Sequence, residues 1–160
     1  MPVASSIAHG AATFRQNAQI FPKCHEGLTA EEWQRRPGDL SNSVLWIVGH
    51  VVWARSRAIA LLGGSWSAPW LPLFERGVKR TDTAQYPSAE EVVQAWKDVS
   101  ESLTAALENA TEEALAAPAK PPSMDGKVSG MVNFLAYHET YHVGQAAYLR
   151  RWLGHEGPVG

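Results

Sequence analysis

Residues 127–154 read KVSGMVNFLAYHETYHVGQAAYLRRWLG, and their apolar members recur at the three- and four-residue steps of an α-helix. The predicted stripe consists of Met131, Leu135, His138, His142, Gln145, Leu149 and Trp152. Because most of this stripe is apolar, we expect it to face the interior of a helical bundle. Two histidines therefore lie on a helix face that is predicted to be buried.

Three further segments show helical periodicity. They are residues 3–21, which stop at Pro22, residues 44–62, which follow an N-cap at Ser41 and stop at Gly63, and residues 89–110, which follow the capping-box pattern Ser88 to Glu91. Thr29 to Glu32 forms a second capping-box pattern, which predicts one or two additional helical turns.

The connections between these segments show no alternation typical of strands. A long connection, residues 64–87, separates the second and third helices, and a shorter proline-containing one, residues 117–126, precedes the last. The sequence thus predicts an all-α fold, a four-helix bundle that forms a single domain over residues 1–160.

Composition excludes several classes of protein. The 160 residues are 45% hydrophobic and 19% charged, which is typical of a globular chain. The net charge is −2 with no basic run, so nucleic acid is not expected as a partner. Cys24 is the one cysteine, which excludes an intramolecular disulfide, and the N-terminus lacks the pattern of a signal peptide. Apolar runs such as residues 44–52 are too short to cross a membrane, so we expect a soluble cytoplasmic protein.

Seven tryptophans are more than a core of this size requires. Trp66 and Trp70 lie in the proline-rich connection, where no periodicity explains them. We expect them to anchor a loop that folds back on the bundle; the alternative is an aromatic wall over a pocket or an oligomer contact.

The two histidines on the stripe are four residues apart, which places them about 40° apart around the helix axis. Two imidazoles at this spacing can bind one metal ion from the same helix face. A single buried histidine is usually a hydrogen-bonded core residue, but two stacked on a core face both lose hydration and are hard to satisfy without a common partner. His138 and His142 therefore predict a site for a divalent metal ion.

Such a site needs a third protein ligand. His9, His25 and His155 lie near the predicted helix ends in polar surroundings, whereas His50 lies in the middle of an apolar helix. That helix is apolar almost all round, so periodicity does not fix the direction of the His50 ring. The residues alone leave two interpretations of His50, a third metal ligand or a core histidine bonded to a backbone carbonyl.

The residues from His138 to His142 also match the H-E-x-x-H pattern of zincin peptidases, in which the glutamate is the general base. A peptidase is disfavoured because only His155, beyond the helix end, follows as a further ligand, and no sheet edge is predicted to bind a peptide. Glu139 lies about 100° from His138 around the helix. It either reaches a metal-bound water or faces solvent.

Other side chains near the histidines are candidates for supporting roles. Gln145 either orients a ligand ring, holds a metal-bound water or is a buried glutamine satisfied by a neighbouring helix. Tyr141 is close enough to the stripe to line a pocket. Arg55 and Arg57 are candidates for binding an anionic substrate, although a surface role is favoured for each. Glu139, Gln145 and Tyr141 are our candidate catalytic residues, for proton transfer or orientation.

The segment from His138 through Gln145 to Gly154 resembles the closing segment of the DinB/YfiT-like metalloenzyme superfamily. The run Leu28-Thr-Ala-Glu-Glu-Trp-Gln-Arg-Arg-Pro37-Gly, followed by a capped helix with a histidine at His50, is similar as well. The order of these elements covers nearly the whole chain.

This resemblance implies a four-helix bundle, usually a homodimer, whose divalent metal ligands are His50, His138 and His142. Zinc and nickel are the metals it implies, and small-molecule thiols such as mycothiol or bacillithiol are co-substrates of some relatives. We therefore expect a metal-dependent enzyme that acts on a small molecule, either a hydrolase or a thiol S-transferase. The alternative is a metal-binding or stress-response protein without turnover.

Overall fold

The computed structural model describes residues 3–78 and 83–159, and the described chain forms helices and connections without a strand. Four long helices form the bundle: α1 (Ala8–His25), α3 (Val44–Leu61), α4 (Ala89–Asn109) and α6 (Val128–Trp152). The shorter elements are α2 (Ala30–Gln34), α5 (Glu112–Leu115) and the 3₁₀ turns η1 (Ser5–Ile7), η2 (Leu71–Phe74) and η3 (Thr83–Gln85). The predicted all-α four-helix bundle is confirmed.

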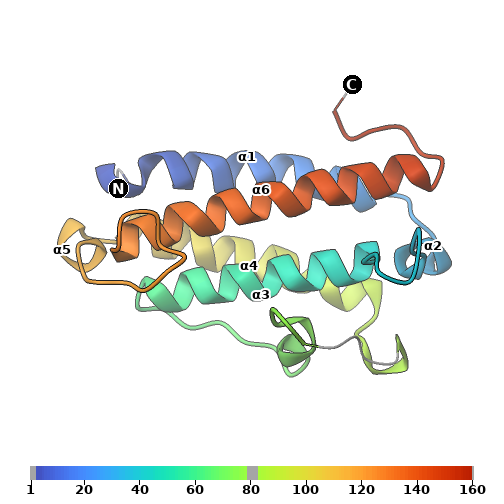
Figure 1. The fold of residues 1–160 in the computed structure, drawn as a ribbon, viewed down its shortest axis with the longest axis horizontal. Helices are drawn as coiled ribbons and strands as arrows, with labels where there is room; N and C mark the ends of the chain where they lie inside the picture. Colours follow the sequence, from blue (N-terminus) through green and yellow to red (C-terminus); the bar gives the residue numbers. More distant parts are fainter. Residues whose placement is uncertain (1–2, 79–82, 160) are drawn as a thin grey trace.

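The direction of the helices explains the long connection. Figure 1 shows that α1 and α6 run one way along the bundle, whereas α3 and α4 run the opposite way. Because α3 and α4 are parallel neighbours, the chain between them must return along the length of the bundle. Residues 62–88 make this crossover, of which residues 79–82 lie outside the described part.

Two of the three predicted N-caps are confirmed. Thr29 and Ser88 each accept a hydrogen bond from the backbone of the glutamate three residues later, which bonds back to the cap, so both capping boxes form. The prediction of Ser41 as the cap of α3 is wrong, because Ser43 caps it and accepts from the N–H of Trp46 at 3.2 Å. Ser41 belongs to the preceding turn, where its N–H donates to the carbonyl of Gly38.

The first helix passes through the residue that was predicted to stop it. Pro22 lies inside α1, which continues for one more turn to His25. Proline removes only one hydrogen bond from a helix, and the carbonyl of Pro22 still accepts from the N–H of Glu26 at 3.1 Å.

The buried face of α6 lies one residue further along than the predicted stripe. Its buried centre consists of Val132, Ala136, Glu139, Val143 and Ala146, with His142 and Leu149 beside it. Alanine at this centre lets α1 pack closely, and Glu139 is buried because it has an ionic partner. As a result Met131, Leu135 and His138 are only half-buried and lie at the edge of the core.

The expectation that Trp66 and Trp70 anchor the crossover is confirmed, since both pack partly buried against the core. Trp70 contacts Phe74 edge-to-face at a ring separation of 5.5 Å, and Phe74 is fully buried. The turn η2 is thereby held against α3.

Arg55 was favoured as a surface residue, and this is wrong. Its side chain is 2% exposed and forms a bidentate ion pair with Glu139 at 2.7 and 2.8 Å. The side chain of Glu139 is itself only 1% exposed. The Arg55 guanidinium also donates to the hydroxyl of Ser100 and the carbonyl of Phe14, and lies 3.9 Å over the ring of Trp96. One side chain of α3 thus contacts α1, α4 and α6.

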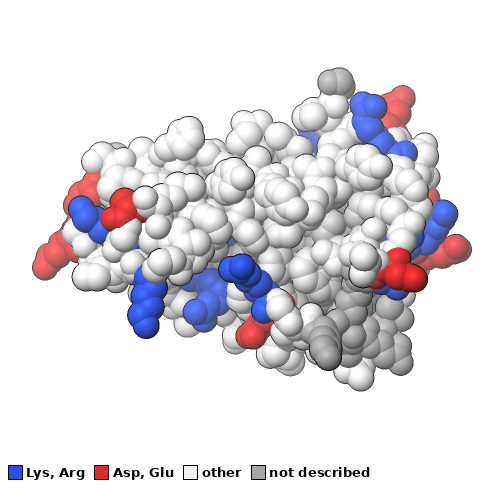
Figure 2. All heavy atoms as spheres, in the orientation of Figure 1, with Lys and Arg blue, Asp and Glu red and all other residues white. Residues whose placement is uncertain are grey.

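Among the described helices, α3 alone has the length and mean hydropathy, 1.3 over 18 residues, that would suffice to cross a membrane. However, 72% of that segment is buried inside the bundle, as expected of the central helix of a soluble protein. In the view of Figure 2, charged side chains gather at the two ends and along one edge, and the face over α6 is largely uncharged.

We predict that Glu139→Ala lowers the free energy of unfolding of the metal-free protein by about 3–5 kcal/mol, because it leaves the Arg55 charge buried and unpaired. Urea denaturation followed by circular dichroism measures the change. Glu101→Ala, at an exposed position of α4, is the matched control and should change stability by less than about 0.5 kcal/mol. A loss below about 1 kcal/mol for Glu139→Ala would show that the pair is not a structural requirement.

Candidate metal centre

Three histidines from two helices converge at one point of the bundle. The Nε2 atom of His138 lies 3.0 Å from Nε2 of His142 and 3.3 Å from Nε2 of His50. His50 comes from α3, and the other two come from successive turns of α6. All three ligand atoms lie within 4.8 Å of one another.

The hydrogen bonds made by the Nδ1 atoms of His50 and His142 determine the tautomer of each ring. Nδ1 of His50 lies 2.7 Å from the carbonyl oxygen of Phe74, which can only accept, so Nδ1 carries the proton. Nδ1 of His142 lies 2.8 Å from Oε1 of Gln145 and donates in the same way. In both neutral rings Nε2 then presents a lone pair toward His138. A single N–H of His138 cannot satisfy two lone pairs, whereas a cation at the centre can.

The distances fit a small divalent ion. Zinc bonds to imidazole nitrogen at about 2.0–2.1 Å, so two nitrogens on one tetrahedral ion are about 3.3–3.4 Å apart. The separations of 3.0 and 3.3 Å are close to this value. Three neutral nitrogen ligands leave a fourth position open, the arrangement of catalytic rather than structural zinc sites.

Burial keeps the imidazoles neutral. Desolvation is the largest of the causes that lower the pKa of His138 to about 4, and the Coulombic effects of His50 and Arg76 are part of the same shift. Desolvation, with smaller contributions from His50 and His138, likewise lowers the pKa of His142 to about 4. It also lowers the pKa of His50, against the opposing hydrogen bond to Phe74. At neutral pH all three rings therefore have a free lone pair for a metal.

Two tryptophans hold the ring of His50 between them. Trp46 stacks on one side at 4.7 Å with an interplanar angle of 11°, and Trp53 stacks on the other at 5.2 Å and 22°. Gly49 makes room for the third support, because a Cβ at position 49 would overlap the ring of Phe74. The tryptophans and the Phe74 carbonyl together fix the direction of His50, which periodicity had left open.

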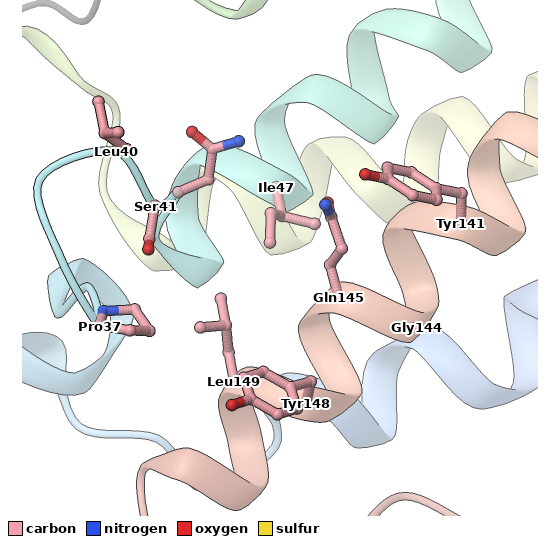
Figure 3. Close-up of a pocket in the computed structure, with 10 residues that line it drawn as sticks. Pro37, Leu40, Ser41, Ile47, Tyr141, Gly144, Gln145, Tyr148 and Leu149 are labelled. Atoms are coloured by element: carbon pink, nitrogen blue, oxygen red, sulfur yellow. The ribbon is translucent and has the colours of Figure 1, made fainter.

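Two hollows lie near the centre, and only one includes a ligand. A cavity of about 450 Å³ is lined by His138 together with Trp53 and Phe134. A larger hollow of about 650 Å³ lies between α6, the start of α3 and the segment before it, and none of the three histidines lines it. In Figure 3, Tyr141 and Gln145 point into the space of this larger hollow, opposite Ile47. The smaller cavity is therefore the one of the two that one of the three histidines lines.

The structure places the three candidate catalytic residues in different surroundings. Glu139 neither faces solvent nor is available as a base, because both carboxylate oxygens are bonded to Arg55. Gln145 orients the ring of His142. Tyr141 is 57% exposed and packs its ring edge against His142 at 5.2 Å. Arg57 is exposed and lines the smaller cavity.

The remaining histidines lie outside the centre. His155 bonds to Glu32 at 2.9 Å, which excludes it as a nearby ligand, and His9 is exposed on α1. His25 is not in polar company as expected, because it is buried against Phe21 and Trp33.

Several functional residues were missed by the sequence analysis. The spacing of Trp46 and Trp53, four before and three after His50, places them on the same side of a helix and could have indicated the stacking. The carbonyl of Phe74 contacts His50 and the side chain of Arg76 lines the cavity beside His138, and no local pattern in the crossover indicates either of them.

Comparison with known proteins agrees with this description. A crystal structure of a conserved protein from Enterococcus faecalis superposes with a TM-score of 0.70, covering 89% of this chain and 94% of that one, at 17% sequence identity. At this identity the similarity shows the fold alone. No functionally curated protein matches the sequence. Residues 13–146, which include all three histidines, match the sequence profile of the DinB superfamily, and the chain therefore belongs to the DinB superfamily.

Proposed function

We propose that this protein is a metal-dependent enzyme that acts on a small molecule, with zinc or nickel held by His50, His138 and His142. The observation that carries the proposal is the convergence of the three Nε2 atoms, two of them with lone pairs fixed by hydrogen bonds on the far side of their rings. Imidazole nitrogens suit both metals, so the ligand set supports either.

A divalent ion held by the three histidines would supply Lewis-acid chemistry and would lower the pKa of a coordinated water or thiol. The side chains and backbone around the centre orient the histidine rings and provide an apolar surface beside them. Gln145 and Phe74 hold two ligand rings, and Trp53 covers one side of His50 while also lining the cavity next to His138.

The cavity favours thiol transfer over hydrolysis of the zincin type. Its described lining contains no carboxylate, and the glutamate of the H-E-x-x-H pattern is bonded to Arg55. Hydrolysis of that type needs a carboxylate base beside the attacking water, whereas a thiol ionises near neutral pH once a cation stabilises its thiolate. We therefore propose thiol-dependent S-transfer as the reaction class.

The thiol would be part of a substrate. Burial raises the pKa of the Cys24 thiol to about 11, so the protein's own cysteine stays protonated and unreactive at neutral pH. The alternative function, a metal-binding or stress-response protein without turnover, needs no route from a ligand to solvent. The position of the half-buried His138 in the wall of a cavity favours the enzyme.

We predict that the wild-type protein binds about one zinc or nickel ion per chain, as expected of one three-nitrogen site. Substituting alanine for His50, His138 or His142 should abolish this stoichiometric uptake, because the remnant leaves the ion mostly hydrated. Elemental analysis after loading and dialysis measures the content. His9→Ala removes an exposed histidine and should retain the full amount. Wild-type protein that remains metal-free after loading would refute the proposed site.

A second prediction concerns the hydrogen bond from His142 to Gln145. Gln145→Leu should weaken metal affinity by about 10–100-fold, the usual effect of losing a group that orients a ligand, while stoichiometry at saturation stays the same. Competition with a chromophoric chelator measures the affinity. An unchanged dissociation constant would mean that Gln145 does not orient the ring.

We also propose a homodimer formed through the outer face of α6. Tyr137, Tyr141 and Tyr148 are 61%, 57% and 67% exposed on this helix, and the surrounding face carries few charges (Figure 2). Exposed aromatic side chains on an uncharged surface are typical of protein–protein contacts.

Light scattering should report a dimer at micromolar concentration, and Tyr148→Glu should produce a monomer because it places a charge in the contact. The matched control is Ala105→Glu, which adds the same charge to an exposed position of α4 and should leave the dimer intact. A wild-type protein that is monomeric under these conditions would refute the dimer.

A further inference from the structure

The cavity beside His138 has an apolar wall. It measures about 450 Å³, within the range of small-molecule sites, and lies between α3, α6 and the residues that follow η2. Its apolar lining is formed by Trp53, Leu61, Pro122, Met131, Phe134 and Leu135. Phe134 also stacks against the ring of His138 at a centroid distance of 6.1 Å and an angle of 26°, so the apolar wall continues to the metal ligand.

Two arginines, Arg57 and Arg76, line the same cavity. Both are exposed, and neither forms an ion pair with an acidic side chain in the part of the chain that the structure describes. Two guanidinium groups at one small cavity repel each other, and an anion between them would relieve this repulsion. Guanidinium groups bind the oxygens of carboxylates and phosphates in pairs, which gives both charge and geometry.

We infer that this cavity binds a substrate with an apolar body and one anionic oxyacid group, with Arg57 and Arg76 binding the anion. The apolar body lies against Phe134 and Trp53, and the opposite end of the substrate reaches the open side of the three-histidine centre. The role of that reacting end depends on the proposed function; the binding of the anion by the arginines does not. The larger hollow of Figure 3 has no charged residue in its lining and offers no such recognition.

The test compares three probes of similar shape: 3-phenylpropionate, 2-phenylethylphosphonate and the neutral 3-phenylpropanamide. Binding is measured by isothermal titration calorimetry at pH 7 on the full chain, both metal-free and loaded with zinc. The metal-free protein is needed because a carboxylate or phosphonate can also bind directly to zinc. In that form the preference for an anion reports on the arginines.

We expect at least one anionic probe to bind the metal-free protein about tenfold or more tightly than the amide, since hydrogen bonds to a charged group are worth that much. Which anion binds more tightly distinguishes a carboxylate from a phosphate-type substrate. Arg57→Gln and Arg76→Gln should each remove most of the preference. Arg151→Gln, at an exposed arginine of α6 outside the cavity lining, should retain it. The three substituted positions are exposed, and thermal midpoints equal to the wild type would establish that the variants fold.

The inference is wrong if the amide binds as tightly as both anions, or if the preference for anions survives both arginine substitutions. Metal content measured on the same preparations separates this failure from failure of the proposed function. Protein that takes up zinc but shows no anion preference retains the metal centre and overturns the arginine site. Protein that prefers anions but takes up no metal supports the arginine site and overturns the proposed metal centre.

Discussion

The ion pair between Arg55 and Glu139 fixes the arrangement of the bundle. A guanidinium that is almost fully buried must have all its charge compensated, and here the compensation comes from every other long helix. Glu139 of α6 supplies the opposite charge, Ser100 and Trp96 of α4 supply an acceptor and an aromatic face, and the carbonyl of Phe14 belongs to α1. Any rotation or shift of one helix would break at least one of these contacts, so the pair selects one register among many that apolar packing alone would permit.

The geometry of the three-histidine group depends on that register. Glu139 follows His138 directly, and Arg55 lies five residues after His50, so the pair that joins α3 to α6 also sets the distance between the histidines of the two helices. The crossover adds the last constraint, because the Phe74 carbonyl reaches His50 only where Gly49 leaves room for the Phe74 ring. A glutamate that in a zincin would act on water is bonded to Arg55 here and helps to position the adjacent histidine.

Short-range sequence patterns predicted most of the helices and their caps correctly. The capping boxes at Thr29 and Ser88 and the helical spacing of His138 and His142 depend on residues three or four apart, and such short-range relations are visible in the sequence. The rotation of α6 was mispredicted because hydropathy treats Glu139 as a surface residue, and only its distant partner makes its burial possible. The Phe74 carbonyl and Arg76 could not be predicted for a related reason, since the crossover brings them to the centre over a long stretch of chain without periodicity.

The three histidines of the candidate centre are not equally constrained. His50 is bonded to Phe74 and stacked between two tryptophans, and His142 is bonded to Gln145. Nδ1 of His138 has no hydrogen-bond partner among the described residues, and its ring is the one in the cavity wall. Some catalytic zinc sites expand from four to five ligands during the reaction, and a ligand ring that can move would accommodate such a change. The His50 and His142 rings are held by hydrogen bonds and would fix the position of a metal ion, whereas His138 is the least constrained ring and lines the cavity, so a shift of His138 would leave those hydrogen bonds intact.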